Sequence, residues 1–139
     1  MWTCPTCQRP FLRAHAWHIC NEKTVDDIFA GKADNILLAF DDVLLATADW
    51  EPNLITAARH AVLMSNLQVW LIARPLTKWL DVSFHSNGPI DSPHLHRSAP
   101  FSKKGRKWRH MIRLHNGGEL NAEMVDLLRL GFEWGMRRG

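Results

Sequence analysis

The sequence LITAARHAVLMSNLQVWLIARPLTKWLDVSFHS, residues 54–86, sets the kind of core that this chain can build. It consists of short runs rich in Val, Ile, Leu, Phe and Trp, and turn-forming residues interrupt these runs at Ser65-Asn66 and at Pro75. Short apolar runs bounded by turn residues are typical of β-strands. We therefore expect antiparallel strands at about 54–58, 61–65, 68–73 and 78–86.

Two helices are predicted ahead of these strands. Thr24 can cap a short helix over residues 24–30, and Gly31 can end it. A second helix is predicted over residues 34–47, where Asp41 and Asp42 lie opposite an apolar stripe. Six residues at helical spacing form that stripe: Ile36, Leu37, Phe40, Val43, Leu44 and Thr47. This helix is expected to cover a core.

The chain after the strands is predicted to form a loop, a last strand and a helix. Residues 87–106 contain three prolines and two glycines, which are typical of a long surface loop. Residues 107–115 alternate as a strand does, with a basic outer face. The last helix follows from a stripe of apolar residues: Leu120, Met124, Leu127, Leu128 and Phe132. The expected fold class is α+β, an antiparallel sheet of four to five strands with helices on one face.

Size and composition favour one main domain. The chain has 139 residues, of which 46% are hydrophobic and 22% charged, as is ordinary for a globular protein. No apolar run approaches the length of a membrane span, and the N-terminus is rich in cysteine where a signal peptide would be apolar. We therefore expect a cytoplasmic protein that does not enter membranes.

All three cysteines lie within the first twenty residues, together with His15 and His18. Cys4 and Cys7 have the spacing of a zinc knuckle, and the second pair of ligands must come from His15, His18 and Cys20. The preferred set is Cys4, Cys7, His18 and Cys20, with His15 as the substitute for His18. Because protein atoms would fill all four positions, the expected Zn²⁺ is structural. Residues 1–21 would then form a zinc knuckle, and residues 22–139 the α+β domain.

The sequence also resembles a known family. The pattern Cys4-Pro5-x-Cys7-x3-Phe11-x6-His18-x-Cys20, followed by Thr24-Val25-Asp26-Asp27-Ile28-Phe29, is similar to the start of bacterial proteins that carry domain of unknown function 5655. The resemblance continues through residues 78–84 and 91–93 and spans nearly the whole chain. It implies an α+β fold and a Cys-Cys-His-Cys metal site in which His18 is preferred to His15. It implies no reaction.

Charge is distributed unevenly along the chain. Eight of the fourteen acids lie between residues 22 and 51, whereas residues 92–118 contain no acid. Lysine and arginine release counterions when they contact phosphate, so the basic stretch is the candidate for binding nucleic acid or an acidic protein surface. Its residues are Lys103, Lys104, Arg106, Lys107, Arg109 and Arg113. Alternatively, the acidic helix at 34–47 would meet the basic strand of a second copy in a homodimer.

The favoured function is therefore that of a small zinc-stabilised binding module. One alternative is a small-molecule or metal-handling protein, with a pocket between sheet and helices walled by Trp70, Trp79 and Trp108. A second metal site could form from His94 and His96 with His85 and Asp91 upstream. A third hypothesis is a nuclease-like enzyme that uses His94, His96 and Asp91. We find no nucleophile paired with a base and no phosphate-binding glycine loop, so the sequence favours binding over catalysis.

Overall fold

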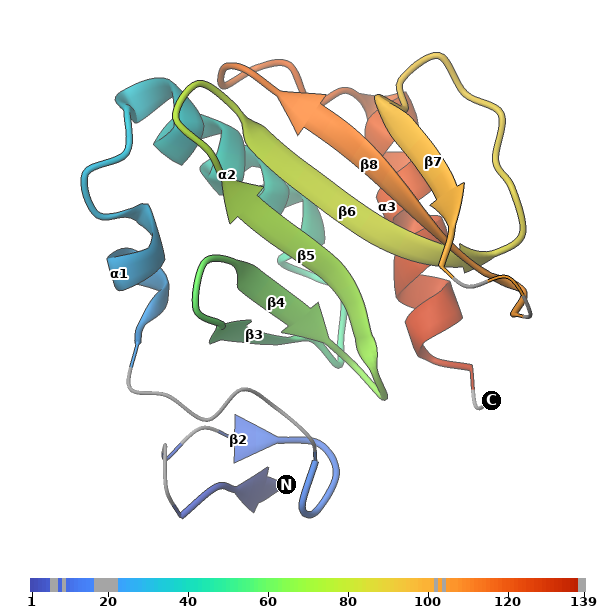
Figure 1. Cartoon of the computed structure of the whole chain (residues 1–139). Coiled ribbons are helices and arrows are strands. Elements are labelled where there is room, and N and C mark those ends of the chain that lie inside the picture. The colour runs from blue at the N-terminus through green and yellow to red at the C-terminus, as the bar shows by residue number, and fades with distance from the viewer. Residues whose placement is uncertain (6–7, 9, 17–22, 102, 104, 138–139) are drawn as a thin grey trace.

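The structure is a computed structural model that describes residues 1–5, 8, 10–16, 23–101, 103 and 105–137 (Figure 1). In these residues, a hairpin of β1 (Trp2–Thr3) and β2 (Pro10–Phe11) precedes a six-stranded antiparallel sheet and three helices, which confirms the α+β class. The helices are α1 (Val25–Phe29), α2 (Asp34–Thr47) and α3 (Ala122–Gly135). The strands of the sheet are β3 (Leu54–Ala57), β4 (Val62–Ser65), β5 (Val69–Pro75), β6 (Leu80–Asn87), β7 (Arg97–Pro100) and β8 (Lys107–Leu114).

The sheet has the strand order β3-β4-β5-β6-β8-β7. The expected count of four to five strands was wrong, because β7 lies inside the segment predicted as a loop. This strand has only four residues and includes Pro100, so nothing in its local sequence indicates a strand. It exists through pairing with β8, in which Arg97 faces Met111 and Ala99 faces Arg109. An edge position tolerates its proline, because one side of an edge strand needs no hydrogen bonds.

Side-chain caps begin two of the helices. At α1, the Asp27 N–H donates to Thr24 Oγ1 and the Thr24 N–H donates to Asp27 Oδ2, at 3.2 and 2.9 Å. The pKa of Asp27 is lowered in this capping box, chiefly because the Thr24 backbone N–H, and secondly because the Thr24 side chain, stabilises the ionised carboxylate. At α3, the Met124 N–H donates to Asn121 Oδ1 at 2.9 Å. Local sequence thus explains where both helices begin, although only the cap at Thr24 was predicted.

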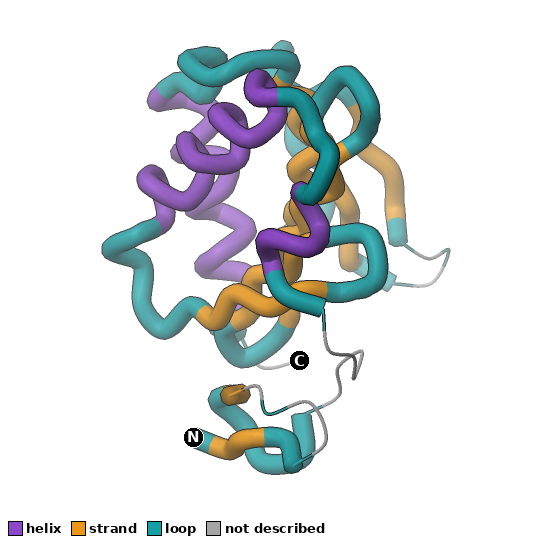
Figure 2. Tube along the Cα trace, turned by 90° about the vertical axis from the view of Figure 1, so that its left-hand side faces the viewer, coloured by secondary structure: helices purple, strands orange, loops and turns teal. Residues whose placement is uncertain are grey.

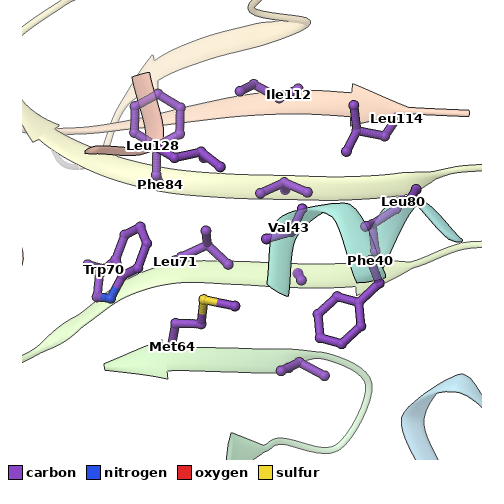
Figure 3. Packing of buried hydrophobic residues seen from close by; sticks show 14 of the residues in the cluster. Phe40, Val43, Met64, Trp70, Leu71, Leu80, Phe84, Ile112, Leu114 and Leu128 are labelled. Atoms are coloured by element: carbon purple, nitrogen blue, oxygen red, sulfur yellow. The ribbon is translucent and has the colours of Figure 1, made fainter. Parts of the chain in front are cut away.

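One face of the sheet carries the core. The two longer helices, α2 and α3, lie against this face, and Figure 2 shows them on one side of the strands. Alternate residues of the central strands belong to the core, among them Leu80, Val82 and Phe84 of β6. Figure 3 shows Leu80 and Phe84 within this core. The pairing of β4 with β5 skips Trp70, which lets Trp70 and Leu71 both be fully buried.

The opposite face of the sheet, here called the open face, is partly covered at one side. Over β3 and β4, a pocket of about 400 Å³ lies between residues 11–16 and the sheet, where Leu54, Thr56 and Leu63 line it. The chain segment of the hairpin therefore rests on the open face at this side. Across β5, β6, β8 and β7, the open face carries the site described next.

Candidate functional site: a basic pocket on the open face

Strand register brings side chains from four strands together on the open face. Residues that face one another across paired strands point to the same side, and so do residues two apart along one strand. Three rows result: Arg74, Asp81 and Arg113; Ile72, Ser83, Met111 and Arg97; and His85, Arg109 and Ala99. Arginines separated in the sequence thus lie on the same face of the sheet.

These side chains surround a pocket of about 450 Å³, here called the open-face pocket. Arg74, Arg97 and Arg109 come from β5, β7 and β8, and all three are exposed. None of them forms an ion pair with any residue that the structure describes. The lining consists of Ile72, Arg74, Asp81, Ser83, Arg97, Ala99, Pro100, Phe101, Arg109 and Met111. The pocket therefore combines an apolar floor with an excess of positive charge.

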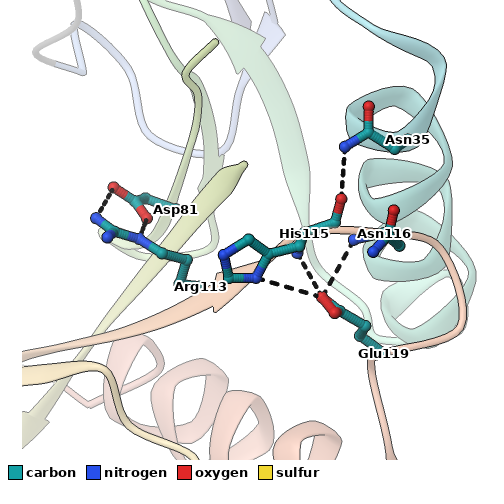
Figure 4. A network of polar contacts seen from close by, with 6 residues as sticks. All are labelled: Asn35, Asp81, Arg113, His115, Asn116 and Glu119. Atoms are coloured by element: carbon teal, nitrogen blue, oxygen red, sulfur yellow. Dashed lines mark hydrogen bonds and ion pairs between the residues drawn. The ribbon is translucent and has the colours of Figure 1, made fainter. Parts of the chain in front are cut away.

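The carboxylate that lines this pocket is already neutralised. Asp81 accepts hydrogen bonds from Nε and Nη2 of Arg113, at 2.8 and 3.3 Å (Figure 4). The Arg113 guanidinium also lies over the ring of Trp79, 4.2 Å from its centroid. The hydrogen bonds with Asp81 raise the pKa of Arg113. Asp81 is thus held by Arg113, which leaves the three pocket arginines available to an anion.

Phe101 supplies an aromatic wall at the other end of the pocket. Its side chain is 52% exposed, although Lys107 Nζ lies 4.2 Å from the ring centroid and the Arg109 guanidinium carbon 5.1 Å. Burial lowers the pKa of Lys107, and the nearby charge of Arg109 adds to this effect. An exposed ring beside two cations suits a ligand that is both planar and anionic.

His85 lies beneath this wall. Its ring contacts Phe101 edge-on, with ring centroids 6.0 Å apart, and lies tilted against Trp134, with centroids 5.2 Å apart. The residue is only 2% exposed. Neither ring nitrogen has a hydrogen-bond partner among the described residues. Burial lowers the pKa of His85 to about 3, with smaller contributions from Lys107, Arg109 and His110, whereas the Val69 backbone acts in the opposite direction. His85 is therefore neutral at physiological pH.

A second buried histidine, His110, is fully bonded on the core side of the sheet. Its Nε2 lies 2.7 Å from Ser86 Oγ, and its Nδ1 lies 2.8 Å from Ser98 Oγ. Because the Ser86 hydroxyl donates to the Gly88 carbonyl at 2.8 Å, it accepts from Nε2–H, and Nδ1 accepts from the Ser98 hydroxyl. Burial lowers the pKa of His110. These hydrogen bonds link β6, β8 and β7, so we assign His110 a structural role.

The basic stretch predicted from the sequence divides into four parts. Arg109 lines the open-face pocket, Arg113 binds Asp81, and Lys107 lies over Phe101. Lys103 and Arg106 are exposed in the connection between β7 and β8, and Lys104 lies outside the described residues. Arg74 and Arg97 were not among the predicted binding residues, although Arg97 lies in the stretch without acids. Alternation along β5 could have indicated the side of Arg74, whereas the side of Arg97 could be predicted only if residues 97–100 were known to form a strand.

The three tryptophans of the alternative pocket occupy different environments. Trp70 is fully buried, and its Nε1 donates to Asn53 Oδ1 at 3.0 Å. Trp79 contacts Arg113 and His115, whereas Trp108 stacks on His110 with ring centroids 6.3 Å apart. Trp70 belongs to the packed core, so it offers no exposed surface to a ligand.

The residues of the predicted second metal site lie in different surroundings. His94 Nε2 lies 2.6 Å from Glu123 Oε2, and His85 is enclosed by Phe101 and Trp134. His96 and Asp91 are exposed. In the part of the chain that the structure describes, no three His, Cys, Asp or Glu side chains are grouped so as to hold a metal ion.

The predicted zinc knuckle lies largely in residues that the structure does not describe. Cys7, His18 and Cys20 fall outside the described residues. Cys4 is buried, and its carbonyl accepts from the Gln8 N–H at 2.8 Å. Gln8 has a φ of 62°, as tight turns often require. His15 is exposed, with its ring 5.2 Å from that of Trp2.

Fold and site together define a small α+β protein with a helix-covered core and a basic open sheet face. The chain belongs to the family described as a domain of unknown function (DUF5655), whose sequence pattern it matches over residues 25–135. This match confirms the resemblance for the α+β domain and begins after the cysteine segment. No match was found among curated proteins or among solved structures. None of the helices in the described ranges is long and apolar enough to cross a bilayer.

Proposed function

We propose that this protein is a zinc-stabilised module that binds nucleic acid in its open-face pocket. The observation that carries the proposal is the meeting of Arg74, Arg97 and Arg109 around one pocket whose carboxylate is already bound by Arg113. Guanidinium groups match phosphate oxygens in charge and geometry. Phe101 offers an exposed ring on which a base can stack.

Single strands fit this arrangement better than a duplex. A base must leave the helical stack before it can lie on Phe101 inside a pocket, and a single strand presents its bases without that cost. The pocket volume of about 450 Å³ lies within the range of small-ligand sites, so it has room for one nucleotide unit. The ligand is accordingly single-stranded DNA or RNA.

We also propose that Cys4, Cys7, His18 and Cys20 hold one structural Zn²⁺. Cys4 is the proposed ligand that the structure describes, and its burial together with the turn to Gln8 supports a knuckle at this position. The metal would supply the stability that a segment of this length cannot gain from its own core. No catalytic step is assigned to it.

The binding proposal is tested by fluorescence anisotropy with short single-stranded DNA and RNA at about 50 and about 200 mM salt. The double variant Arg97→Ala, Arg109→Ala is expected to weaken binding roughly tenfold or more and to reduce its salt dependence. The matched control, Arg129→Ala with Arg137→Ala, removes the same charge from α3 and its C-terminal end and should change little. Salt-insensitive binding, or equal losses in both double variants, would contradict the proposal.

A separate variant tests the loop cations. Lys103→Ala with Arg106→Ala removes two exposed charges from the connection between β7 and β8. Because these side chains do not line the pocket, we expect a smaller loss than for Arg97 and Arg109. A larger loss would move the site from the pocket to this connection.

A further inference from the structure

A second basic pocket adjoins the open-face pocket. It has a volume of about 400 Å³ and lies where the end of β5 meets α1 and the turn between β3 and β4, here called the end pocket. Figure 1 shows α1 beside this end of the sheet. Its charged and titratable lining residues are Lys23, Asp27, Lys32, Arg59, His60 and Arg74.

Cations outnumber carboxylates in the end pocket. Lys23 Nζ donates to the Arg59 carbonyl at 2.9 Å, which fixes the Lys23 ammonium group next to Arg59. The carboxylate of Asp27 is held in the capping box of α1, where it accepts from the Thr24 N–H. Four cationic side chains therefore share the pocket with one carboxylate that already has a structural partner. An anion is the ligand that such a pocket attracts.

Arg74 lines both pockets. It is exposed at the end of β5, and it lies three strands away from β7, the strand that carries Arg97. Three strand spacings correspond to about 14 Å. The end pocket continues from Arg74 away from β7. A ligand that fills both pockets must therefore carry several anionic groups along an extended chain.

From this geometry we infer that the end pocket is a second phosphate-binding subsite, so that one single strand of several nucleotides runs from the open-face pocket over Arg74 into it. This inference rests on the proposed function and deepens it by naming the form of the ligand. A mononucleotide occupies only the open-face pocket. The second pocket thus raises affinity for a polynucleotide without improving affinity for its unit.

The test compares ligands of different length on the full chain. Binding of thymidine monophosphate and of oligothymidylates of about four and about twelve nucleotides is measured for the unaltered protein and two double variants. The end-pocket variant is Lys32→Ala with Arg59→Ala, which leaves intact the Arg59 carbonyl that Lys23 contacts. The open-face variant is Arg97→Ala with Arg109→Ala, and Arg129→Ala with Arg137→Ala is the control. Circular dichroism confirms that each variant is folded.

The end-pocket variant should bind the longest oligonucleotide roughly tenfold more weakly and retain affinity for thymidine monophosphate. Its salt dependence for the long ligand should fall by about 0.7 in log–log slope for each phosphate that it no longer neutralises. If the open-face variant loses affinity while the end-pocket variant does not, the proposed function stands and this inference is overturned. If the end-pocket variant loses equal affinity for all three ligands, the pocket is no separate subsite. If the unaltered protein binds none of them, both proposals are overturned.

Discussion

Asp81 and Arg113 face each other across β6 and β8, and their side chains form two hydrogen bonds of 2.8 and 3.3 Å. On its other side, Asp81 faces Arg74 of β5, with which it forms no ion pair in the described residues. The Asp81 carboxylate thus binds Arg113, which does not line the pocket. This single pairing leaves the pocket arginines to an external anion.

Asp81→Asn should therefore tighten nucleic-acid binding while it destabilises the fold. The substitution leaves Arg113 without its carboxylate and adds one net positive charge beside the pocket. We expect binding roughly three- to tenfold tighter at low salt, with a steeper salt dependence. Asp34→Asn makes the same change in net charge on α2 and should leave affinity nearly unchanged. Weaker binding by Asp81→Asn would show that this carboxylate contacts the ligand favourably.

Gly131→Ala should destabilise the protein. A Cβ at this position would lie 2.9 Å from Phe84 Cβ and 3.3 Å from Trp70 Cε3, in the packed contact between α3 and the sheet. Overpacking of this kind costs about 1–3 kcal/mol, which outweighs the gain of up to about 1 kcal/mol from replacing glycine within a helix. Urea unfolding measures the difference. The neighbouring exposed substitution Leu130→Ala is the control, and a Gly131→Ala protein that is more stable would contradict this packing.

Stability should fall as the pH drops from about 6.5 towards 3, in part because of His85. The folded protein keeps His85 neutral down to a pKa of about 3, whereas the unfolded chain protonates it near the ordinary value of 6.5. The unfolded state therefore binds more protons within this window. Each fully buried neutral histidine contributes a slope of up to about 1.4 kcal/mol per pH unit there. Above the window this contribution to stability is fully present.

The substitution His85→Leu tests whether His85 contributes to this pH dependence of stability. Neither ring nitrogen has a partner among the described residues, so at pH 7 the substitution should preserve or raise the free energy of unfolding. It should also reduce the slope below pH 6.5 without abolishing it, because burial lowers the pKa of His110 as well. An unchanged pH profile would contradict the buried, neutral state of His85.

Zinc removal should act locally. We expect about one zinc per chain, and a strong chelator should make residues 1–21 susceptible to proteolysis while the six-stranded sheet stays folded. Hydrogen exchange read segment by segment distinguishes the two regions. Ser substitutions at Cys4 and Cys7 provide the genetic equivalent. A protein purified without metal, and protected from protease in its first residues, would contradict the knuckle.

Much of the α+β domain was predictable because its signals are local. The capping residue Thr24 begins α1, and Asn66 and Pro75 lie at the ends of strands, as their turn chemistry requires. Strand β7 was not predictable, since it depends on pairing with β8 and not on its own four residues. Trp70 could likewise be placed in a hydrophobic run but not in the bulge that buries it, because the bulge depends on how β5 pairs with β4.

The site was predictable only in part. The run of basic residues near Arg109 indicated β8, one of the strands that line the open-face pocket, but the residues of such a run are divided between two sheet faces and a loop once the chain is folded. Arg74 and Arg97 lie far apart in the sequence, and only the strand register, which pairs Arg74 with Asp81 and Arg97 with Met111, places both on the open face. The partnership of Asp81 with Arg113 likewise required the sheet.

The two sides of this molecule have unlike charge. Asp34 and Asp41 are exposed on α2, and Arg74, Arg97 and Arg109 are exposed on the open face, opposite the face that α2 covers. Two copies attracted through these sides meet head to tail, which leaves one acidic and one basic side uncovered and cannot close by a twofold rotation. Such attraction builds open chains of molecules, strongest when little salt is present. A bound polyanion would occupy the arginines on which each link depends, so the proposed nucleic-acid binding would compete with such self-association.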